Sequence, residues 1–540
     1  MAYKDIREYL TALKQRGLLR VVDEPVNKDT ELMPLVRWQY RALAENQRTG
    51  FYFTNLVGTK GEKYKGSLAV AIVGASRKVY ACGLDCEIEK IAEKWEHALS
   101  NPIAPTIVES GPVQDEIHIG DSLLEHGGLD EFPIHLSTPG FDPAPYITAG
   151  SWHTKDPETG VQNIGTYRAM IKGQLKTGLS TRHNHITAHW AKYRKLRKPM
   201  PAAIVIGGPP SIAMTSVTKV PFGVDEMTIA GALDGKPLEV VKCQTIDMLV
   251  PAYAEIVIEG EVLTDYKELE APFGEYTGYV AERDFKQVFV VKCITHRKDP
   301  VYHDFISQMP PSESSMIRSI GEESGMLKFL RVDCGLTNVK DVGFPQTSGG
   351  WQMCVIQLHK VWTPRPTHSE AWQALCASLA RAGGYPKMAV AVDDDIDPRD
   401  VESVVWALSF RQQPHLDMKI IEGRFSALDP SSAPPEASLR ERFYPMGATG
   451  PRGGSSILID ATMKWPYPPV ALPDKRFMDA AKERWEKLGF PELTPKKPWH
   501  GYDLGHWTDQ NRLEADRAVA GDFMTTIAEL EKSGIQEDDI

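Results

Sequence analysis

The strongest constraint on the fold is a series of strand-like segments between residues 126 and 310. Short runs of apolar and β-branched residues alternate there with turns, and few helical patterns interrupt them. Many short strands at close intervals favour a β-barrel or a β-sandwich. The strands that we predict are Tyr146–His153, Asn163–Ile171, Ala202–Ile206, Leu238–Cys243, Tyr253–Ile258 and Gln287–His296.

The amino-terminal region has mixed helix and strand patterns. Ile6, Leu10 and Leu13 lie at helical spacing within residues 3–16, and Gly17 follows as a favourable carboxy-terminal cap. The segment therefore predicts a first helix that ends at Gly17. Further strands are predicted at Leu18–Val22, Gly50–Asn55 and Ser67–Val73, with a helix from about Asp29.

Beyond residue 310 the pattern becomes alternating helix and strand. A helix at Ser369–Ala382 and an apolar strand at Met388–Val392 predict an α/β layer. The acidic run Asp393–Asp395 is either a magnesium site or a solvated loop that caps a helix. A final amphipathic helix, Asp509–Ser533, either contacts another subunit or packs against its own domain.

These patterns predict a mixed α+β protein. We expect an N-terminal mixed α/β domain, a central β-barrel domain, a C-terminal α/β domain and a terminal arm with a helix that serves oligomerisation. The corresponding residue ranges are 1–125, 126–315, 316–480 and 481–540.

Composition excludes several classes of partner. The chain of 540 residues has a formal charge of −11 and no basic stripe, which argues against nucleic acid. Its amino terminus lacks the apolar core of a secretory signal, and the longest uncharged run, Met200–Thr218, is interrupted by Gly207–Pro210. We read that run as a strand, a turn and a following segment. Seven scattered cysteines, an odd number, predict reduced thiols and a cytoplasmic location.

The segment Lys267–Tyr279, K-E-L-E-A-P-F-G-E-Y-T-G-Y, is the first candidate for chemistry. Its acids Glu270 and Glu275 are five residues apart, so a strand would place them on opposite faces and a helix about 140° apart. Pro272 and Gly274 can bend the chain so that both carboxylates reach one pocket. Two neighbouring acids can act as one proton donor and one acceptor. The alternative is an ordinary turn with solvated glutamates.

Three other polar segments lie in the same β region. They are N-I-G-T-Y-R (Asn163–Arg168), F-G-V-D-E (Phe222–Glu226) and a histidine cluster. An amide oxygen, an imidazole and a carboxylate suit a divalent ion such as Mg²⁺ or Mn²⁺, although a single histidine is more often a core or surface residue. Asn163 and Arg168 would face opposite sides of a regular strand, so a bend at Gly165 or a bulge is expected. The histidines are His183, His185 and His189.

Taken in order, these motifs resemble the UbiD family of prenylated-flavin-dependent decarboxylases. The ordered set is N-x4-R, a downstream histidine, G-V-x-E, E-x-P-F-G-E and a later lysine before an acidic strand end. The similarity covers roughly residues 1–470 and includes S-S-I-L-I-D-A-T-M-K-W (Ser455–Trp465). It implies that the central domain is a split β-barrel that binds prenylated FMN.

The resemblance also implies roles for individual residues. A divalent ion, Mn²⁺, Mg²⁺ or Fe²⁺, would link the flavin phosphate to Asn163, Glu226 and either His185 or His183, with His185 fitting the spacing better. A neighbouring K⁺ would share Glu226 and use Ser216. The residues that correspond to the family's catalytic network are Arg168, Glu270 and Glu275, with Arg168 and Lys387 also contacting the cofactor. Where family members vary around the flavin, this chain has Lys219, an extra cation that would favour an anionic substrate or cofactor group.

The implied activity is reversible, non-oxidative decarboxylation of an aromatic or other α,β-unsaturated acid. Removal of CO₂ from an unsaturated carbon needs an electron sink, which a cofactor supplies. We expect Arg168 to orient the substrate carboxylate and keep Glu270 ionised, and Glu275 to supply the proton. An aryl-CoA such as phthaloyl-CoA is as compatible as a free aromatic acid.

Three alternatives stay open at this point. They are a carboxylase subunit that works in the CO₂-fixing direction, a non-catalytic flavin-binding homologue and a conventional FMN oxidoreductase. Where the cofactor is a prenylated flavin, a flavin prenyltransferase supplies it. The family further implies a homo-oligomer, from dimer to hexamer. From composition, we expect neither nucleic acid nor a membrane as a partner.

Overall fold

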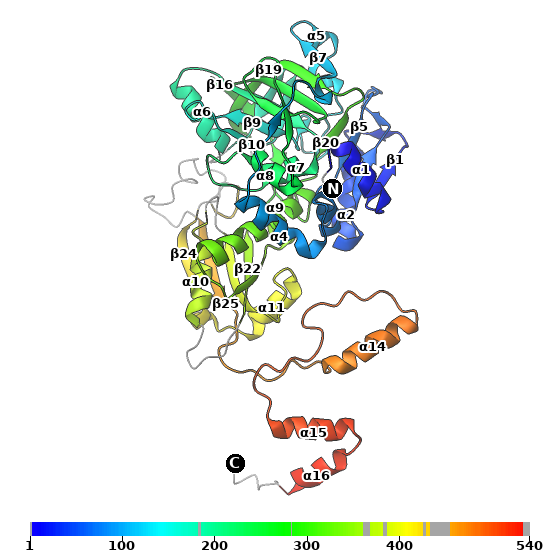
Figure 1. The fold of residues 1–540 in the computed structure, drawn as a ribbon, viewed down its shortest axis with the longest axis vertical. Helices are drawn as coiled ribbons and strands as arrows, with labels where there is room; N and C mark the ends of the chain where they lie inside the picture. The colour runs from blue at the N-terminus through cyan, green and yellow to red at the C-terminus, as the bar shows by residue number, and fades with distance from the viewer. Residues whose placement is uncertain are drawn as a thin grey trace.

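The fold is described from a computed structural model that covers residues 3–181, 185–281, 283–359, 368–381, 386–424, 428–432 and 454–532. His183 lies outside these residues. Figure 1 shows a blue N-terminal region beside a green central sheet, a yellow-green C-terminal layer and a separate orange and red tail. Among the described residues, no helix has the length and apolar character needed to cross a membrane.

The N-terminal region is built on a four-stranded sheet, in the order β1–β3–β5–β20. The first helix, α1, is found as predicted and precedes Gly17, whose φ is +69°. Strand β20 follows the central region in the sequence, and it pairs in parallel with β5. The elements are α1 (Ile6–Gln15), β1 (Leu19–Val22), α2 (Leu32–Ala42), β3 (Gly50–Phe53), β5 (Ser67–Val70), α3 (Arg77–Gly83), α4 (Ile91–Ser100) and β20 (Val301–Asp304).

The central region is a curled nine-stranded sheet, in the order β10–β9–β13–β16–β19–β12–β11–β8, with β7 also paired to β19. Its mixed α+β character is as predicted, although three helices, α6 to α8, interrupt what the sequence showed as almost wholly β. The strands are β7 (Glu116–Ile119), β8 (Tyr146–Ile147), β9 (Ser151–Lys155), β10 (Gln162–Thr166), β11 (Ala169–Gly173), β12 (Lys176–Leu179), β13 (Met200–Ile206), β16 (Ile256–Glu270) and β19 (Asp284–His296), and the helices are α6 (His185–Lys195), α7 (Pro210–Val217) and α8 (Glu226–Asp234).

Two predicted strands are wrong in their continuity. The segment Tyr146–His153 divides into β8 and β9, and Asn163–Ile171 divides into β10 and β11. In the second case the chain leaves the ladder at Tyr167 and Arg168, because β10 pairs with β9 whereas β11 pairs with β12 and β8. The predicted run Met200–Thr218 is a strand, a turn and a helix, β13 followed by α7.

The buried helix α9 (Glu313–Lys328) connects the central sheet to the C-terminal layer. Its first residue, Glu313, accepts hydrogen bonds from the backbone N–H groups of Ala71, Val73 and Ile306. The layer that follows is a five-stranded sheet, in the order β21–β22–β23–β25–β24. Its elements are β21 (Val339–Gly343), β22 (Met353–Leu358), α10 (His368–Ser378), β23 (Met388–Asp393), α11 (Val401–Phe410), β24 (Met418–Arg424) and β25 (Gly454–Asp460).

The tail carries three helices, α14 (Lys475–Lys487), α15 (Asp509–Val519) and α16 (Phe523–Glu531). None of their residues is buried, and Figure 1 shows the helices away from the body of the molecule. The single helix predicted for Asp509–Ser533 is wrong, because Gly521, with φ +85°, separates α15 from α16. The division of the chain at residues 125, 315 and 480 stays a prediction.

Candidate active site

The structure brings Arg168, Glu270 and Glu275 together. Glu270 is the last residue of β16, and Glu275 lies in the hairpin formed by β17 (Phe273–Gly274) and β18 (Val280–Ala281). The Nε atom of Arg168 donates to Glu270 Oε1 at 2.7 Å, and its Nη1 atom donates to Glu275 Oε1. One guanidinium therefore bridges two carboxylates that are five residues apart in the sequence.

The turn between the two acids is shaped by close packing. Gly274 does not have a positive φ; a Cβ there would lie 2.6 Å from Cγ of Gln308, so any other residue would have to displace that side chain. The positive φ that the hairpin needs is at Gly278, with +90°. The backbone N–H of Glu275 donates to the carbonyl oxygen of Tyr279 at 2.8 Å, which closes the hairpin.

The three charged side chains are shielded from water to different degrees. Side-chain exposure is 13% for Arg168, 1% for Glu270 and 17% for Glu275. Burial alone would lower the pKa of Arg168, but attraction to Glu275 and Glu270 outweighs it, so the pKa is raised and the guanidinium stays charged. The arginine is therefore a fixed positive charge in a shielded site.

One carboxylate oxygen of this cluster is left without a partner. Within the described part of the chain, Glu270 Oε2 is buried and accepts no hydrogen bond. Around it, the ring of Phe273 lies 5.1 Å from the Arg168 guanidinium and 4.3 Å from the ring of Tyr146. A buried carboxylate oxygen without a donor is costly, so a bound ligand that donates a hydrogen bond would fit this position.

The break between β10 and β11 decides how Asn163 and Arg168 are presented. The predicted irregularity is present, but it lies at Tyr167 and Arg168 rather than at Gly165. Gly165 has a different role: the Tyr167 ring folds back over it, and a Cβ at Gly165 would lie 2.4 Å from the Tyr167 hydroxyl oxygen. Because Arg168 lies outside both strands, the alternation rule for a regular strand does not apply to it.

Asn163, His185 and Glu226 form a second cluster. Asn163 Oδ1 is 2.9 Å from His185 Nδ1, which lies 3.8 Å from Glu226 Oε1. Glu226 is 3% exposed, and burial raises its pKa, although His185 and the backbone N–H of Ile164 oppose the rise. Asn163 lies on β10, whereas Glu226 begins α8 and His185 begins α6.

The donor atoms of this second cluster suit a cation. With its oxygen toward His185 and Glu226, the Asn163 amide faces two other acceptors, and turning it around would let its nitrogen donate to Glu226 at 3.3 Å and to His185 at 2.9 Å. The unturned arrangement directs an amide oxygen, an imidazole nitrogen and a carboxylate oxygen to one point, which is a donor set for a divalent ion. The residues present therefore fit the predicted ion.

The other predicted site residues lie in different surroundings. The Ser216 hydroxyl is buried at the end of α7, 2.8 Å from the Thr166 hydroxyl of β10. His189, the third histidine of the cluster, is fixed by Thr154 at 3.0 Å, and burial lowers its pKa to about 4. Lys387 binds Asp429 at 2.9 Å and Ser431 at 2.7 Å, and it makes no contact with the two clusters among the residues described here.

The acidic run Asp393–Asp395 has a structural explanation. The buried Arg411 binds Asp395 through both of its terminal nitrogens, at 2.7 and 2.6 Å, and Asp393 at 3.2 Å. Asp394 binds His359 at 2.9 Å. The run therefore compensates a buried arginine, which favours the structural reading over the magnesium site.

Sequence reasoning missed how the hairpin tip meets the C-terminal layer. The ring of Tyr276, next to Glu275, stacks on Trp351 at 5.9 Å, and Arg318 lies 4.7 Å from Tyr276. Lys219 lies 3.6 Å from the Trp351 ring, and burial lowers its pKa to about 8. The sequence offers no signal for this contact, because its members are scattered over more than 100 residues.

A small cavity lies behind the Arg168 cluster. It is lined by Phe273 and by residues of the segment after β20, and it leaves no room for even one water molecule. Pockets that enclose drug-sized ligands are far larger, at about 300–1,000 Å³. A flavin would therefore have to bind outside this enclosed space.

Comparison with known families identifies two matching regions. Residues 106–310 match the family model UbiD, described as the 3-octaprenyl-4-hydroxybenzoate carboxy-lyase Rift-related domain. Residues 315–461 match UbiD_C, the C-terminal domain of the same carboxy-lyase. Together they span more than half of the chain.

Solved structures show the same fold. The UbiD-class enzyme HmfF from Pelotomaculum thermopropionicum, in complex with FMN, has a TM-score of 0.73 and 28% identity over 86% of this chain and 95% of that chain. Vanillic acid decarboxylase from Sedimentibacter hydroxybenzoicus has a TM-score of 0.74 and 25% identity, over 90% and 99%. The 3,4-dihydroxybenzoic acid decarboxylase of Klebsiella pneumoniae, at 23% identity and a TM-score of 0.73 over 91% and 98%, supports the fold alone.

Proposed function

Because this chain belongs to the UbiD family of flavin-dependent carboxy-lyases, we propose that it interconverts an aromatic or other α,β-unsaturated carboxylic acid and its decarboxylated product without oxidation. The observation that carries the proposal is the Arg168 bridge between Glu270 and Glu275, together with the unpartnered Glu270 Oε2. A guanidinium and two carboxylates in a shielded site provide an anion-binding group and a proton donor at one place.

Each residue of this cluster has a proposed task. Arg168 binds the substrate carboxylate, for which a planar, permanently charged guanidinium is well suited. Glu270 stays ionised beside Arg168 and holds the guanidinium in position. Glu275, the more exposed of the two acids, gives its proton to the carbon that loses CO₂ and takes it back in the reverse direction.

The cofactor assignment rests on the second cluster. Asn163, His185 and Glu226 would hold a divalent ion, Mn²⁺, Mg²⁺ or Fe²⁺, that binds a flavin phosphate, and Ser216 would contribute to a neighbouring K⁺. A prenylated FMN would supply the electron sink that decarboxylation at an unsaturated carbon requires. Lys387, which pairs with Asp429, is the least supported of the proposed cofactor contacts.

The substrate class follows from the cations beside the site. Lys219 and Arg318 both lie against Trp351, next to the hairpin that carries Glu275. They favour a substrate with a second negative group, such as an aryl-CoA thioester, of which phthaloyl-CoA is one example. The same residues serve the carboxylating direction, since one transition state is crossed both ways.

The proposal includes a cytoplasmic location, a flavin prenyltransferase as cofactor supplier and a homo-oligomer. The exposed apolar side chains of the tail support the last of these. They include Trp485, Leu488, Phe523, Met524 and Ile527, which a second copy of the chain would cover.

The test is a substrate screen with protein produced together with a flavin prenyltransferase. Aryl acids and aryl-CoA esters are incubated in deuterated buffer, and mass spectrometry follows loss of 44 mass units and deuterium uptake at the vacated carbon. We expect both signals for at least one compound, and neither signal with protein that carries ordinary FMN. Full turnover with ordinary FMN would refute the proposed cofactor.

The same screen with Arg168→Lys tests the site. The variant keeps the positive charge but loses the paired N–H groups that bind a carboxylate through two hydrogen bonds. Turnover should therefore fall while the flavin spectrum is retained. Unchanged turnover in this variant would refute the assignment of Arg168.

A further inference from the structure

Four side chains unrelated to the proposed active site converge where β7 meets β19. They are His118 on β7, His126 after the short helix α5 (Ser122–Glu125), Glu131 at the end of the 3-10 helix η4 (Gly128–Glu131) and His296 at the end of β19. In the pairing of β7 with β19, His118 lies opposite Ile294, so His118 and His296 are diagonal neighbours on one face. The cluster joins a short connecting segment to the main sheet.

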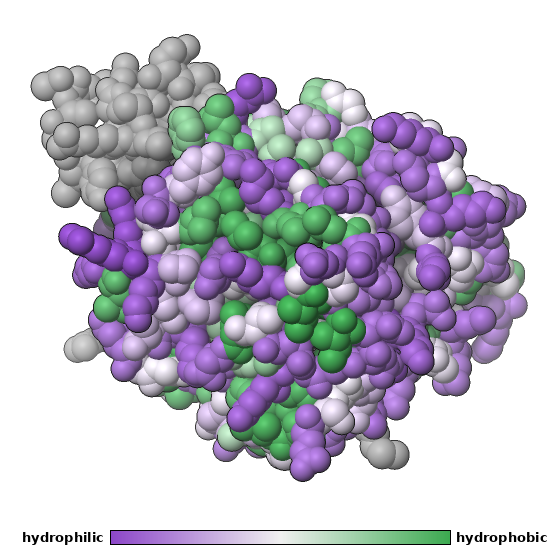
Figure 2. Space-filling model, turned by 90° about the horizontal axis from the view of Figure 1, so that it is seen from above, coloured by the Kyte–Doolittle hydropathy of each residue, from purple (hydrophilic) through white to green (hydrophobic). Residues whose placement is uncertain are grey.

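On strand β7 the isoleucines are exposed and the histidine is buried, which is the reverse of the usual pattern. Ile117 and Ile119 point to solvent, with 44% and 45% exposure, whereas His118 between them is 5% exposed. The opposite arrangement, isoleucine inside and histidine outside, is the ordinary one for a strand with one solvated face. Figure 2, which views the molecule from the end where Figure 1 places α5 and β7, shows apolar residues among the polar ones on this surface.

The ligand atoms of the cluster are close together. One donor atom each from His118, His126 and Glu131 lie within 4.8 Å of one another, and His118 Nδ1 is 3.3 Å from Glu131 Oε2. The rings of His118 and His126 are stacked, with centroids 3.9 Å apart and planes at 16°. Because imidazole binds an ion in the plane of its ring, one ring must turn to share an ion, and His126, exposed at the end of α5, is free to do so.

The hydrogen bonding of the cluster is incomplete. Over the described residues, Glu131 Oε2 and His296 Nε2 are both buried and neither makes a hydrogen bond of normal geometry. His296 Nδ1 donates to the carbonyl oxygen of Arg297 at 2.8 Å, which directs Nε2 toward Glu131 Oε1, 3.5 Å away. His296 is thus held by a backbone carbonyl and faces the Glu131 carboxylate. Residues that orient a metal ligand without touching the ion commonly have this arrangement.

We propose that His118, His126 and Glu131 bind a divalent transition-metal ion such as Zn²⁺, with His296 as a positioning residue for Glu131. Two imidazoles and one carboxylate are a ligand set that Zn²⁺ takes up readily, with water in the fourth position. The ion fixes the segment 116–131 to the end of β19. The site shares no residue with the Asn163, His185 and Glu226 cluster, so it is independent of the proposed function.

The experiment uses the full-length protein, stripped with a chelator and dialysed. Zn²⁺ binding is measured by calorimetry and by metal analysis, and Co²⁺ replaces Zn²⁺ to give a visible absorption band that reports nitrogen and oxygen ligands. Besides any ion at Asn163, His185 and Glu226, wild-type protein should bind a further equivalent of Zn²⁺ that Glu226→Gln retains and His126→Ala loses. His126 is exposed, so the variant should fold normally, which circular dichroism checks.

Two further variants sharpen the test. Glu131→Gln should weaken Zn²⁺ binding at this site by more than about tenfold, and His296→Gln by about tenfold, since loss of an outer residue typically costs 10- to 100-fold in affinity. His97→Ala, which removes an exposed histidine on α4, is the matched control and should leave binding unchanged. The proposal is overturned if His126→Ala and Glu131→Gln bind as many equivalents as the wild type, with unchanged affinity.

Discussion

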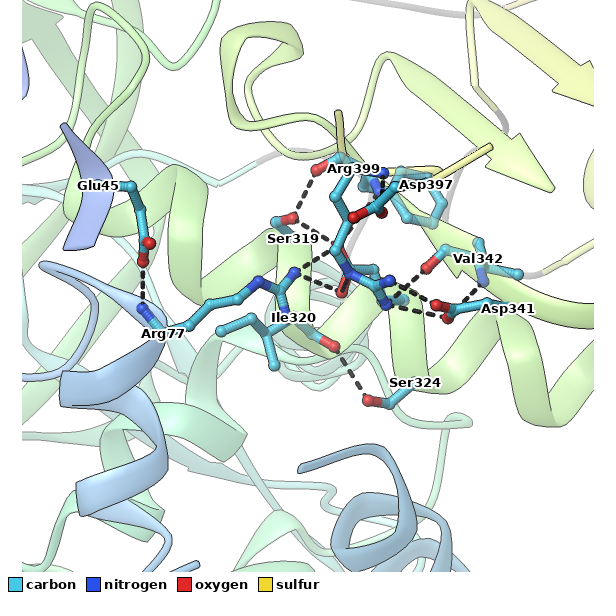
Figure 3. A network of polar contacts seen from close by, with 11 residues as sticks. Glu45, Arg77, Ser319, Ile320, Ser324, Asp341, Val342, Asp397 and Arg399 are labelled. Carbon is cyan, nitrogen blue, oxygen red and sulfur yellow. Dashed lines mark hydrogen bonds and ion pairs between the residues drawn. The ribbon is translucent and has the colours of Figure 1, made fainter. Parts of the chain in front are cut away.

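Two clusters of arginine and glutamate in this protein differ in how completely their hydrogen bonds are satisfied. In the first, Glu323 on α9 accepts from Arg77 through both oxygens, at 2.7 and 2.6 Å, from Arg399 at 3.0 Å and from the Ser319 hydroxyl at 3.1 Å. Figure 3 shows Arg77 and Arg399 approaching from different elements, with Asp341 beside the Arg399 guanidinium. In the second, around Arg168, one oxygen of Glu270 has no donor among the described residues.

The difference distinguishes a structural ion network from a site for a ligand. The Glu323 network joins α3, α9 and the C-terminal layer, and each of its carboxylate oxygens is used by the protein itself. The Arg168 cluster has the same residue types, but one buried carboxylate oxygen of Glu270 accepts no hydrogen bond from the described residues. Buried polar atoms are rarely left unsatisfied without a function, so the open oxygen is the better indicator of chemistry than the arginine–carboxylate pair.

The largest expected effect is on turnover, from Glu275→Gln. Loss of a general acid typically lowers the rate by about 10²- to 10⁴-fold, whereas the fold should be unaffected because glutamine has nearly the same size and shape as glutamate. Decarboxylation with an active substrate and deuterium exchange into the product measure it. Glu268→Gln, on β16 two residues before Glu270 and paired with Lys172 and Lys176, is the matched control. Wild-type turnover in Glu275→Gln would contradict the assignment of the Arg168 cluster as the catalytic one of the two clusters.

A substitution in the saturated network should instead affect stability. Glu323→Ala leaves Arg77 and Arg399 without their shared partner, and since both are partly exposed we expect a loss of about 2–3 kcal/mol in unfolding free energy. The midpoint of urea unfolding followed by circular dichroism measures it. Turnover per folded molecule should stay within about twofold of the wild type, and a selective loss of turnover with unchanged stability would contradict our reading.

A third variant tests the Asn163 cluster. Glu226→Gln removes the charged ligand of the proposed ion, so affinity for the divalent ion and retention of flavin should fall at least about tenfold. Metal analysis and flavin absorbance after gel filtration measure both. Ser211→Ala, which removes a hydroxyl that binds Asp234 near α8, serves as a control for local packing. Full occupancy in Glu226→Gln would show that another group anchors the flavin.

The smallest expected effect concerns Lys219. Burial lowers its pKa to about 8, so its charge is present below pH 8 and is lost as the pH rises through that value. KM for a substrate with a second negative group should therefore rise severalfold above pH 8. Lys219→Met should show the raised KM at pH 7 and no further rise. A rise of KM above pH 8 that persists in the variant would exclude Lys219 as its cause.

The same lysine has a linked effect on stability. Its folded pKa lies below the unfolded value of about 10.4, so the folded state binds fewer protons between pH 8 and 10.4. Stability therefore increases with pH in this window, and Lys219→Met should remove that increase.

Much of the fold was predictable from local patterns. Helix α1 with its Gly17 cap, strand β13 with the turn after it, and the β-rich centre all follow from residue spacing. The wrong predictions are those that depend on partners: a run of strand-forming residues does not show that β10 pairs with β9 while β11 pairs with β12. The break between α15 and α16 was visible as Gly521, but the apolar stripe across it masked the signal.

The sequence by itself determined which groups are available: an arginine, two acids on either side of Ala-Pro-Phe-Gly, and an asparagine, a histidine and a glutamate in a fixed order. Tertiary structure alone decided that Arg168 bridges both acids, that Glu270 keeps an open oxygen, and that His118 and His296 meet on neighbouring strands. The physical reason is that the spacing of side chains along a strand or helix is a local property. Which strands pair, and where a chain stops pairing, depends instead on burial across the whole sheet.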